Sequence, residues 1–309
     1  MRAVTQRQFG GPEVLEVMEV DAPVPLPSEV LVTVRAAGLN PIDAVIRSGA
    51  FPILGQPPFV LGWDLSGVVS EVVPGVNRFK VGDEVYGMPL FPRPAGTYAE
   101  LAAGPSRQLA RKPRSIDHAH AAALPLAGLT AWQSLVDIAD VQPGQRVLVH
   151  AAGGGVGHLA VQIAKHLGAY VIGTVSASKQ EFVRDLGADE VIDYRAVDFT
   201  EAVHDVDVVL ELVGGDYGTR SIEVLRAGGL LVTVVERTSA ELATRAHAAG
   251  RRFAGISVEP DGAGLERLAD LVDAGHLRVH VEHAVPLEDA AKAHALLESG
   301  LRGKAVLTT

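Results

Sequence analysis

The feature that most constrains this chain is a glycine-rich turn between a strand-like and a helix-like segment. Residues 146–150 are a short, mostly apolar run, and residues 151–157 read Ala-Ala-Gly-Gly-Gly-Val-Gly. The next residues carry apolar side chains at helical spacing up to Leu167, and Gly168 is placed to end that helix. Strand, glycine turn and helix together predict a dinucleotide-binding βα unit, in which the turn and the helix N-terminus face a pyrophosphate.

The match of this turn to the pattern Gly-x-Gly-x-x-Gly is incomplete. In the best register Ala152 stands at the first glycine position, and Gly154 and Gly157 occupy the other two. We expect Gly154, Gly155 and Val156 to lie against the cofactor, and Gly157 to let the helix pack close to the sheet. The alternative interpretation is a glycine-rich turn that binds no ligand.

The chain beyond residue 116 has the pattern that such a turn requires. Apolar strand-like segments alternate with helix-like segments, and the predicted strands are 146–150, 170–175, 190–193, 207–212, 229–235 and 253–258. Nearly continuous apolar strands separated by helices predict an α/β fold with a doubly wound parallel sheet. We therefore assign residues 117–258 to a Rossmann cofactor domain.

The first part of the chain has a different pattern. Short β-branched runs, such as residues 30–34 and 66–73, lie between clusters of proline and glycine, which predicts a compact β-rich domain with tight turns. The last segment adds no nucleotide-binding unit and ends in a strand-like run at 304–308, so we expect it to return to the first domain. The predicted division is 1–116 with 259–309 against 117–258, and a length of 309 residues suits two domains.

The residues after the second predicted strand indicate which dinucleotide binds. A site for NAD normally has Asp or Glu about 20 residues after the glycines, where it accepts a hydrogen bond from the ribose 2′-hydroxyl. Here residues 173–179 read Gly-Thr-Val-Ser-Ala-Ser-Lys and hold no carboxylate. Ser176, Ser178 and Lys179 suit a 2′-phosphate, so the predicted cofactor is NADPH. The alternative is that Ser178 only caps the next helix and that Lys179 is solvated.

Composition excludes several classes of function. Asp and Glu outnumber Lys and Arg by 37 to 27, and no basic block offers the surface that nucleic acid or an anionic membrane needs. The absence of cysteine excludes disulfides, thiolate nucleophiles and zinc sites built on cysteine. No apolar run reaches the roughly 18 residues of a membrane span, and the N-terminus lacks the apolar core of a signal peptide. We expect a cytoplasmic protein that acts on a small molecule.

The domain order and a set of short motifs resemble the medium-chain dehydrogenase/reductase superfamily over essentially the whole chain. The motifs are Gly-Leu-Asn-Pro-Ile-Asp at 38–43, Gly-Trp-Asp-Leu-Ser-Gly at 62–67, Val-Gly-Asp-Glu-Val-Tyr-Gly at 81–87, Gly-Thr-Tyr-Ala-Glu at 96–100, Gly-Leu-Thr-Ala-Trp at 128–132, the glycine turn, and Gly-Lys-Ala-Val-Leu at 303–307. The resemblance implies that the β-rich part is a GroES-like catalytic domain.

Departures from the zinc enzymes of that superfamily indicate the branch. Where those enzymes have a cysteine ligand, a Ser or Thr proton relay and a histidine ligand, this chain has Asn40, Ile42 and Trp63, and Asp64 replaces their Glu. A catalytic zinc needs three protein ligands, so we expect no metal. The chain is similar to the zinc-independent quinone oxidoreductases, which include zeta-crystallin-like proteins. That resemblance implies a homodimer paired through the last strand of the cofactor domain.

The resemblance also implies roles for single residues. Asn40 is the candidate donor to a substrate oxygen and Asp43 its partner, and the structural alternatives are a turn-stabilising Asn and a helix cap. Thr130 is expected to face the nicotinamide. The implied substrate pocket holds Phe51, Trp63 and Asp64, of which Trp63 has a core position as its alternative. Further implied cofactor contacts are Tyr194, Val213, Val235 and Lys304.

A reductase without a metal needs a substrate that readily accepts a hydride, such as a quinone or a C=C bond conjugated to a carbonyl. The predicted function is therefore NADPH-dependent reduction of a quinone or an α,β-unsaturated carbonyl compound. One alternative is an enoyl-thioester reductase of fatty-acid or polyketide type, against which Phe51 argues because it stands where a proton-donating Tyr is often found. Another is a dinucleotide-binding structural or sensor protein without catalysis, against which the intact glycine turn argues.

Overall fold

The computed structural model describes residues 1–309, which divide into two compact units. Unit 1 comprises Met1–Leu129, Glu259–Gly275 and Val279–Thr309, and unit 2 comprises Thr130–Val258 and His276–Arg278. The sequence prediction set the first boundary after residue 116. Unit 1 extends further because the Ala-rich helix α2 (His118–Ala122) packs against strands β3 (Glu29–Gly38) and β5 (Leu65–Val72).

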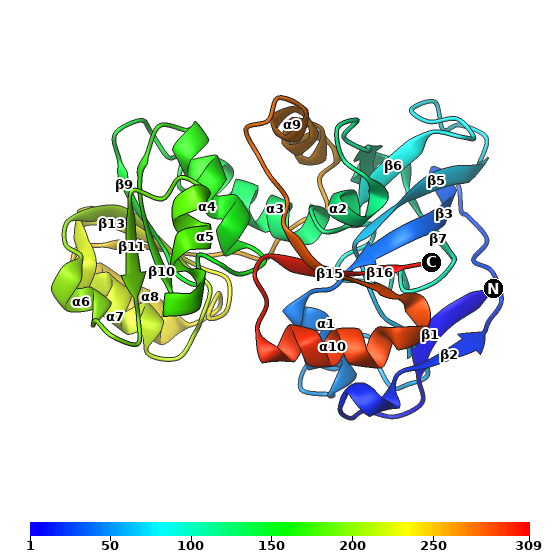
Figure 1. The fold of residues 1–309 in the computed structure, drawn as a ribbon, viewed down its shortest axis with the longest axis horizontal. Helices are drawn as coiled ribbons and strands as arrows, with labels where there is room; N and C mark the ends of the chain where they lie inside the picture. Colours follow the sequence, from blue (N-terminus) through cyan, green and yellow to red (C-terminus); the bar gives the residue numbers. More distant parts are fainter. The chain divides into compact units, whose positions relative to one another are not determined.

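Unit 1 is built on two sheets, coloured mainly blue, cyan and red in Figure 1. The larger sheet has the strand order β15-β16-β3-β5-β6-β8, with β7 paired to β3. Its remaining strands are β6 (Glu84–Gly87), β7 (Leu101–Pro105), β8 (Leu109–Arg111), β15 (Val281–Pro286) and β16 (Lys304–Thr308). The smaller sheet has the order β2-β1-β4, formed by β1 (Arg2–Gln6), β2 (Glu16–Glu19) and β4 (Phe59–Val60).

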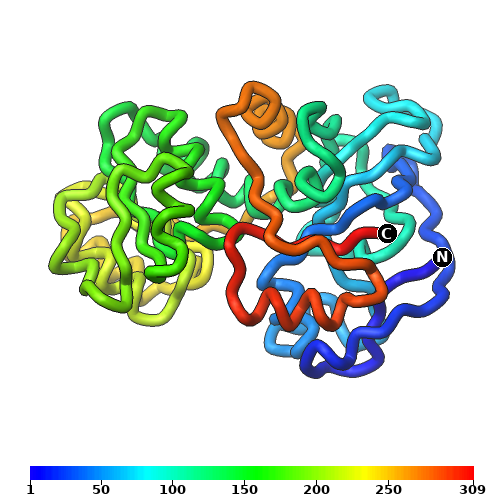
Figure 2. Tube along the Cα trace, viewed as in Figure 1, coloured from blue at the N-terminus to red at the C-terminus, as the bar shows by residue number.

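Alternating apolar residues explain the larger sheet. Val30, Val32 and Val34 of β3 point to one face and pack with Leu65 and Val69 of β5 in a buried cluster. Each such buried side chain contributes about 1.5–3 kcal/mol relative to an exposed one. At the other edge of β3, the C-terminal strand β16 pairs antiparallel. The C-terminal end of the trace is red in Figure 2. The pairing of β16 with β3 brings the end of the chain next to the end of β3.

The helices of unit 1 are α1 (Pro41–Arg47), α2, α9 (Gly262–Asp273) and α10 (Ala290–Ser299), and the 3₁₀ turns are η1 (Pro12–Val14), η2 (Ser106–Gln108) and η5 (Leu287–Asp289). Helix α1 lies in a stretch whose pattern of strands and turns did not predict a helix, and it confirms the alternative interpretation of Asp43 as a helix-capping residue. It forms because Pro41 occupies the first helical position and Asp43 accepts from the backbone N–H of Asn40 at 2.7 Å. None of the helices in the structure is both long and apolar enough to cross a membrane.

Unit 2 contains a six-stranded sheet of parallel strands in the order β11-β10-β9-β12-β13-β14. The strands are β9 (Arg146–Val149), β10 (Tyr170–Val175), β11 (Glu190–Asp193), β12 (Val206–Glu211), β13 (Leu225–Thr233) and β14 (Arg252–Gly255). Numbered within the unit, this is the 3-2-1-4-5-6 order of a Rossmann fold. The predicted doubly wound parallel sheet is confirmed.

The helices of unit 2 cover this sheet. They are α4 (Gly157–His166), η4 (Ala177–Lys179), α5 (Gln180–Asp185), α6 (Phe199–Ala202), α7 (Tyr217–Val224) and α8 (Ala240–Ala248). Helix α3 (Pro125–Trp132) begins in unit 1, and its last three residues and the π-helical segment η3 (Gln133–Ile138) that follows belong to unit 2. Helix α4 packs against β9 and β10, and α7 packs against β12 and β13 (Figure 1). The strand order reverses between β9 and β12, which is where ligands bind in open α/β sheets.

Candidate functional site

The glycine turn lies between β9 and α4, as the sequence predicted. Gly157 is the first residue of α4, and a Cβ atom there would lie 2.3 Å from the carbonyl oxygen of Ala151. No other residue fits at this position without moving the backbone. Ala151 itself has a left-handed φ of 49°, and its carbonyl accepts from Gly154 N at 2.9 Å. The turn is therefore tight, and it lies at the N-terminus of α4, where backbone N–H groups suit an anion.

Lys179 lies beside this turn, and two serines, Ser176 and Ser178, come just before the lysine in the sequence. A Cβ atom on Gly153 would lie 3.2 Å from Lys179 Cδ, so the lysine stem packs against the turn. The hydroxyl oxygens of Ser176 and Ser178 are 3.3 Å apart. Neither hydroxyl caps η4 or α5, so helix capping does not explain the two serines. A cation beside an anion-binding turn and two hydroxyls close to that cation in the sequence fit a dinucleotide that carries a 2′-phosphate.

Three further side chains from the sequence prediction stand where strands of unit 2 end. Tyr194 follows β11 and is 41% exposed, while Val213 and Val235 follow β12 and β13 and are 44% and 50% exposed. A Cβ atom on Gly214 would lie 2.8 Å from Val235 Cγ1, so the loops after β12 and β13 touch. Because the strands are parallel, these side chains lie at the same end of the sheet as the glycine turn, the end where the strands finish.

Glu211 lies at the same end of the sheet, and the sequence pattern did not identify it as a site residue. It ends β12, is fully buried, and accepts from the backbone N–H groups of Val213 at 2.5 Å and Gly214 at 2.6 Å, and from Thr233 Oγ1 at 2.8 Å. The carboxylate therefore holds the loop that presents Val213. The available signal was a carboxylate at the end of an otherwise apolar parallel strand.

In unit 1 the structure brings four predicted site residues together: Asn40, Asp43, Asp64 and Lys304. Asn40 follows β3, Asp64 precedes β5, and Lys304 begins β16. Two backbone hydrogen bonds hold these segments in place. Leu39 N donates to Ala305 O at 3.0 Å, and Gly38 N donates to Asp64 O at 3.3 Å.

The side chains of this polar cluster are connected by hydrogen bonds. Asn40 Nδ2 donates to Asp64 Oδ2 at 2.9 Å, and Lys304 Nζ donates to Asn40 Oδ1 at 2.5 Å and to Leu39 O at 2.6 Å. The ammonium nitrogen of Lys304 is 3.8 Å from Asp64 Oδ2. Asp64 Oδ1 accepts from the backbone N–H of Leu126 at 2.8 Å. Lys304 directs its ammonium group into this cluster of unit 1, and its expected contact with the cofactor stays a prediction.

Burial sets the electrostatics of the cluster. All four side chains are at most 3% exposed. Burial raises the pKa of Asp43 to about 7 and the pKa of Asp64 to about 6, with Lys304 opposing both shifts. Burial lowers the pKa of Lys304, and the two carboxylates oppose that change. Near neutral pH the cluster can therefore gain or lose a proton at Asp43.

Asp43 is tied to a second buried network. Tyr98 Oη donates to Asp43 Oδ2 at 2.9 Å, and the Tyr98 ring meets His294 edge-to-face with centroids 5.8 Å apart. Arg47 lies 2.9 Å from the His294 ring and donates to Glu298 at 2.5 Å. Tyr98 was recognised only as part of a motif, because no local pattern relates it to the helix that carries Asp43.

The remaining predicted site residues differ in exposure. Phe51, in the segment after α1, is 39% exposed, and Val45 on that helix is 40% exposed. Trp63 is 1% exposed and packs edge-to-face on Phe91, and its Nε1 donates to Arg93 O at 2.8 Å, which makes it a core residue of unit 1. Thr130 is 2% exposed on α3 and belongs to unit 2.

The polar cluster does not fit a zinc site. A catalytic zinc needs three ligands with free electron pairs, usually His, Cys or carboxylate. Here the amide oxygen of Asn40 already accepts from the ammonium group of Lys304, and that ammonium also neutralises Asp64. A positive charge in contact with the available oxygens opposes a second cation.

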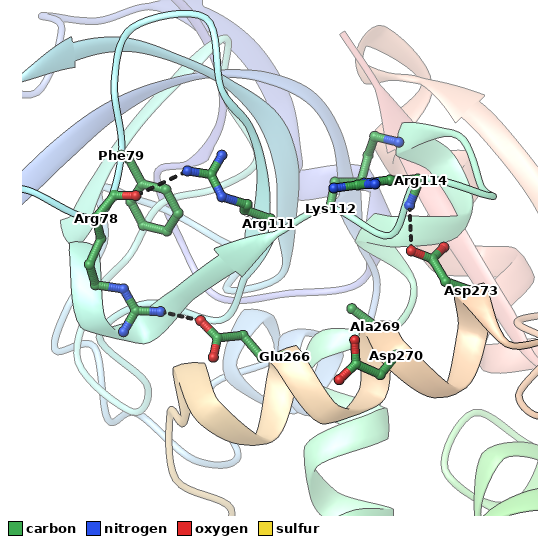
Figure 3. Close-up of a pocket in the computed structure, with 9 residues that line it drawn as sticks. All are labelled: Arg78, Phe79, Arg111, Lys112, Arg114, Glu266, Ala269, Asp270 and Asp273. Carbon is green, nitrogen blue, oxygen red and sulfur yellow. Dashed lines mark hydrogen bonds and ion pairs between the residues drawn. The ribbon is translucent and has the colours of Figure 1, made fainter.

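A charged pocket elsewhere in unit 1 contains none of these residues. It lies between α9 and the segment around β8, and Figure 3 shows its lining residues, Arg78, Phe79, Arg111, Lys112, Arg114, Glu266, Ala269, Asp270 and Asp273. Arg78 pairs with Glu266 at 2.7 Å, and Arg111 pairs with Asp83 outside the pocket lining at 3.0 Å. Two of its arginines are thus paired with carboxylates.

Comparison with known proteins agrees with this geometry. Residues 26–114 match the family described as the alcohol dehydrogenase GroES-like domain, and residues 186–307 match the family described as zinc-binding dehydrogenase. A 2-haloacrylate reductase from Burkholderia sp is 36% identical, over 95% of this chain and 94% of that protein.

Two solved structures extend the likeness to the whole fold. The quinone oxidoreductase from Coxiella burnetii superposes with a TM-score of 0.95 at 38% identity, covering 100% of this chain and 99% of that one. The Escherichia coli quinone oxidoreductase complexed with NADPH superposes with a TM-score of 0.90 at 32% identity, covering 100% of both chains. With its GroES-like unit, its Rossmann unit and these full-length relatives, the chain belongs to the oxidoreductases of the medium-chain dehydrogenase/reductase superfamily, in the quinone oxidoreductase branch that includes zeta-crystallin-like proteins.

Proposed function

We propose that this protein is an NADPH-dependent reductase of quinones or α,β-unsaturated carbonyl compounds and that it works without a metal. The observation that carries the proposal is the glycine turn with Lys179 beside it, which together suit a 2′-phosphorylated dinucleotide. The E. coli relative was solved with NADPH, and the Burkholderia relative is named for reduction of a conjugated alkene. Quinone reduction and the reduction of a conjugated alkene both belong to the chemistry proposed here.

The proposed cofactor site lies in unit 2. Gly154, Gly155, Val156 and Gly157 would take the pyrophosphate, while Ser176, Ser178 and Lys179 would take the 2′-phosphate. Tyr194, Val213 and Val235 offer exposed apolar surface to the rest of the cofactor, and Thr130 is proposed to face the nicotinamide. When bound, NADPH supplies the hydride.

The chain's own contribution to the reaction is proposed to come from Asn40. An amide N–H directed at a substrate oxygen stabilises the negative charge that develops there, which in a dry site is worth about 2.7–4 kcal/mol. The exposed apolar Phe51 and Val45 suit a flat or alkyl-substituted acceptor. Asp43 is proposed to act on Asn40 by holding its backbone, as the 2.7 Å hydrogen bond supports.

The test is to mix the purified protein with NADPH and a panel of quinones, enones and enoyl thioesters, and to follow the loss of nicotinamide absorbance. We expect turnover with quinones or enones, a preference for NADPH over NADH, and lower turnover for Asn40→Ala. Tight NADPH binding without turnover on any acceptor would contradict the proposal and favour a protein that binds the dinucleotide without catalysis.

We further propose a cytoplasmic homodimer. A reductase that consumes NADPH needs a compartment where that cofactor is regenerated. The strand β14 lies at the edge of the unit 2 sheet and has one open side, which supports pairing with the same strand of a second copy. Sedimentation velocity and cell fractionation test the two statements separately.

A further inference from the structure

The side-chain amide of Asn40 is held at both ends by groups of opposite charge. Lys304 Nζ donates to Asn40 Oδ1 at 2.5 Å, and Asn40 Nδ2 donates to Asp64 Oδ2 at 2.9 Å. The three residues are at most 3% exposed, so water does not compete for these bonds. A flipped amide would set its NH₂ group against an ammonium and its oxygen against a carboxylate. One orientation is therefore selected.

Lys304 and Asp64 are in turn braced against the backbone. Lys304 Nζ also donates to Leu39 O at 2.6 Å, and Asp64 Oδ1 accepts from Leu126 N at 2.8 Å. Neither charged group can swing away from Asn40 without breaking a second hydrogen bond. The arrangement also spans three separate segments of unit 1, joined by the pairing of β16 with β3 and of β3 with β5.

This geometry has a chemical consequence for the amide nitrogen. An ammonium on Oδ1 draws electron density from Nδ2 and strengthens both of its N–H groups as donors. Asp64 takes one of these hydrogens, and the second is engaged by neither Asp64 nor Lys304. Stability does not explain the buried pair, because a buried ion pair is often no more stable than apolar residues of similar volume.

We propose that Lys304 and Asp64 are positioning residues, which orient and polarise the Asn40 amide so that its second N–H meets the substrate oxygen where negative charge develops. This inference rests on the proposed function, since it takes Asn40 as the residue that contacts substrate. It assigns Lys304 to Asn40 rather than to the cofactor.

The first test detects the held amide without any turnover. The chain contains two asparagines, Asn40 and Asn77, and Asn77 is exposed. Selective ¹⁵N-asparagine labelling therefore gives two side-chain NH₂ signals, which Asn40→Ala assigns. We expect the Asn40 amide protons to exchange with water at least tenfold more slowly than those of Asn77. Lys304→Met should remove most of this protection, whereas Lys292→Met, which deletes an exposed lysine on α10, should not.

The second test measures turnover and cofactor binding. Lys304→Met should lower kcat by roughly 10- to 100-fold, as expected when a reacting group is misplaced, and should change the Kd for NADPH by no more than about twofold. In the Asn40→Ala background the same substitution should cause no further loss of kcat, because it acts through Asn40. Lys304→Gln, which keeps an N–H donor without the charge, should recover part of the activity.

Lys304→Met leaves Asp64 unpaired and therefore can fail to fold. In that case the double variant Lys304→Met/Asp64→Asn, which removes both charges, is used for the same measurements. The proposal is overturned if Asn40 protection is unchanged in the folded variant, if the kcat losses multiply in the Asn40→Ala background, or if the main effect is on NADPH binding. If the wild type reduces no acceptor, the proposed function fails, and the amide exchange still decides whether Lys304 holds Asn40.

Discussion

Burial shifts the pKa values of several individual groups in this protein. Asp43 and Asp64 have raised pKa values, while burial lowers the pKa of His150 to about 3 and that of His294 to about 3. His150 stays neutral between Thr174 Oγ1 at 2.9 Å and Ser221 Oγ at 3.0 Å. These groups make stability depend on pH in opposite directions, so single variants are needed to separate them.

Asp43→Asn should change the pH dependence of unfolding. Folded Asp43 binds its proton more tightly than the unfolded chain, with a pKa of about 7 against 3.8, so its contribution to stability is full below about pH 4 and is lost as pH rises through 7. Relative to wild type, the variant should therefore gain stability from pH 5 to pH 7, by at most about 1.4 kcal/mol per pH unit. The groups that act on Asp43 are the backbone N–H of Asn40, Tyr98, Asp64 and Lys304.

The measurement is urea unfolding of both proteins at pH 5, 6, 7 and 8. The histidine contributions are common to both chains and cancel in the difference. A difference in unfolding free energy that stays constant over this range would mean that Asp43 titrates no differently in the folded and unfolded chains.

Lys179→Ala combined with Ser176→Asp should change the cofactor preference. Removing charged hydrogen bonds to a 2′-phosphate costs about 1.5–3 kcal/mol, which corresponds to an NADPH affinity lower by one to two orders of magnitude. A carboxylate at Ser176 should at the same time improve acceptance of NADH. Fluorescence titration with both dinucleotides checks this, with Lys165→Ala on α4 as the control that removes a lysine outside the proposed site. An unchanged ratio of affinities would show that the 2′-phosphate site is misplaced.

At the scale of elements, the carboxyl ends of the unit 2 strands carry the proposed cofactor surface. The glycine turn follows β9, Ser176 follows β10, Tyr194 follows β11, and Glu211 ends β12. Parallel strands place all these residues at one end of the sheet. The conformation of each loop therefore depends on the last residues of the strand before it. The loop after β12 depends on Glu211, which satisfies two backbone N–H groups and one hydroxyl.

Glu211→Ala should destabilise the protein and weaken NADPH binding together. It leaves the N–H groups of Val213 and Gly214 and the hydroxyl of Thr233 without their acceptor, and each such buried group costs about 1–3 kcal/mol. Glu211→Gln keeps an acceptor oxygen and should restore most of both properties. Thermal unfolding and NADPH titration on the same preparations provide the check. If Gln were as damaging as Ala, charge rather than loop support would be the role of Glu211.

At the scale of the whole molecule, one chain combines a β-rich unit that encloses the polar cluster with a parallel-sheet unit that carries the glycine turn. The C-terminal strand belongs to the first unit and contributes Lys304 to it. Zinc binding would need ligands from several segments of the chain, so whether the protein binds a metal depends on the complete fold.

The purified protein should contain no stoichiometric zinc, and a chelator should leave its turnover unchanged. The reason is the ammonium group of Lys304, which contacts the oxygen of Asn40 and compensates Asp64. Elemental analysis of protein purified without a metal-affinity tag, with and without added zinc during expression, measures this. One zinc per chain after dialysis would contradict the proposed metal-free mechanism.

The Rossmann unit and the glycine turn could be predicted from the sequence, because both depend on local patterns. The alternation of apolar strands with helices can be recognised from residues that are neighbours in the sequence. A glycine is needed at position 157 because helix α4 begins against the carbonyl oxygen of Ala151. The absence of a carboxylate at the end of β10 also predicts a binding site for a 2′-phosphate from local residues, and this site stays a prediction. Helix α1, by contrast, was missed because seven residues are too few to show a helical period among turns.

The assembly of the polar cluster could not be predicted from the sequence, because it depends on the tertiary fold. Asn40, Asp64 and Lys304 meet through strand pairings between segments up to 264 residues apart, and no local pattern encodes such a register. The burial of Trp63 and the support that Glu211 gives to its loop also depend on packing partners from distant segments. Local sequence specifies which conformations the backbone adopts, whereas the environment of a charged side chain, and hence its chemistry, follows from what the complete fold places around it.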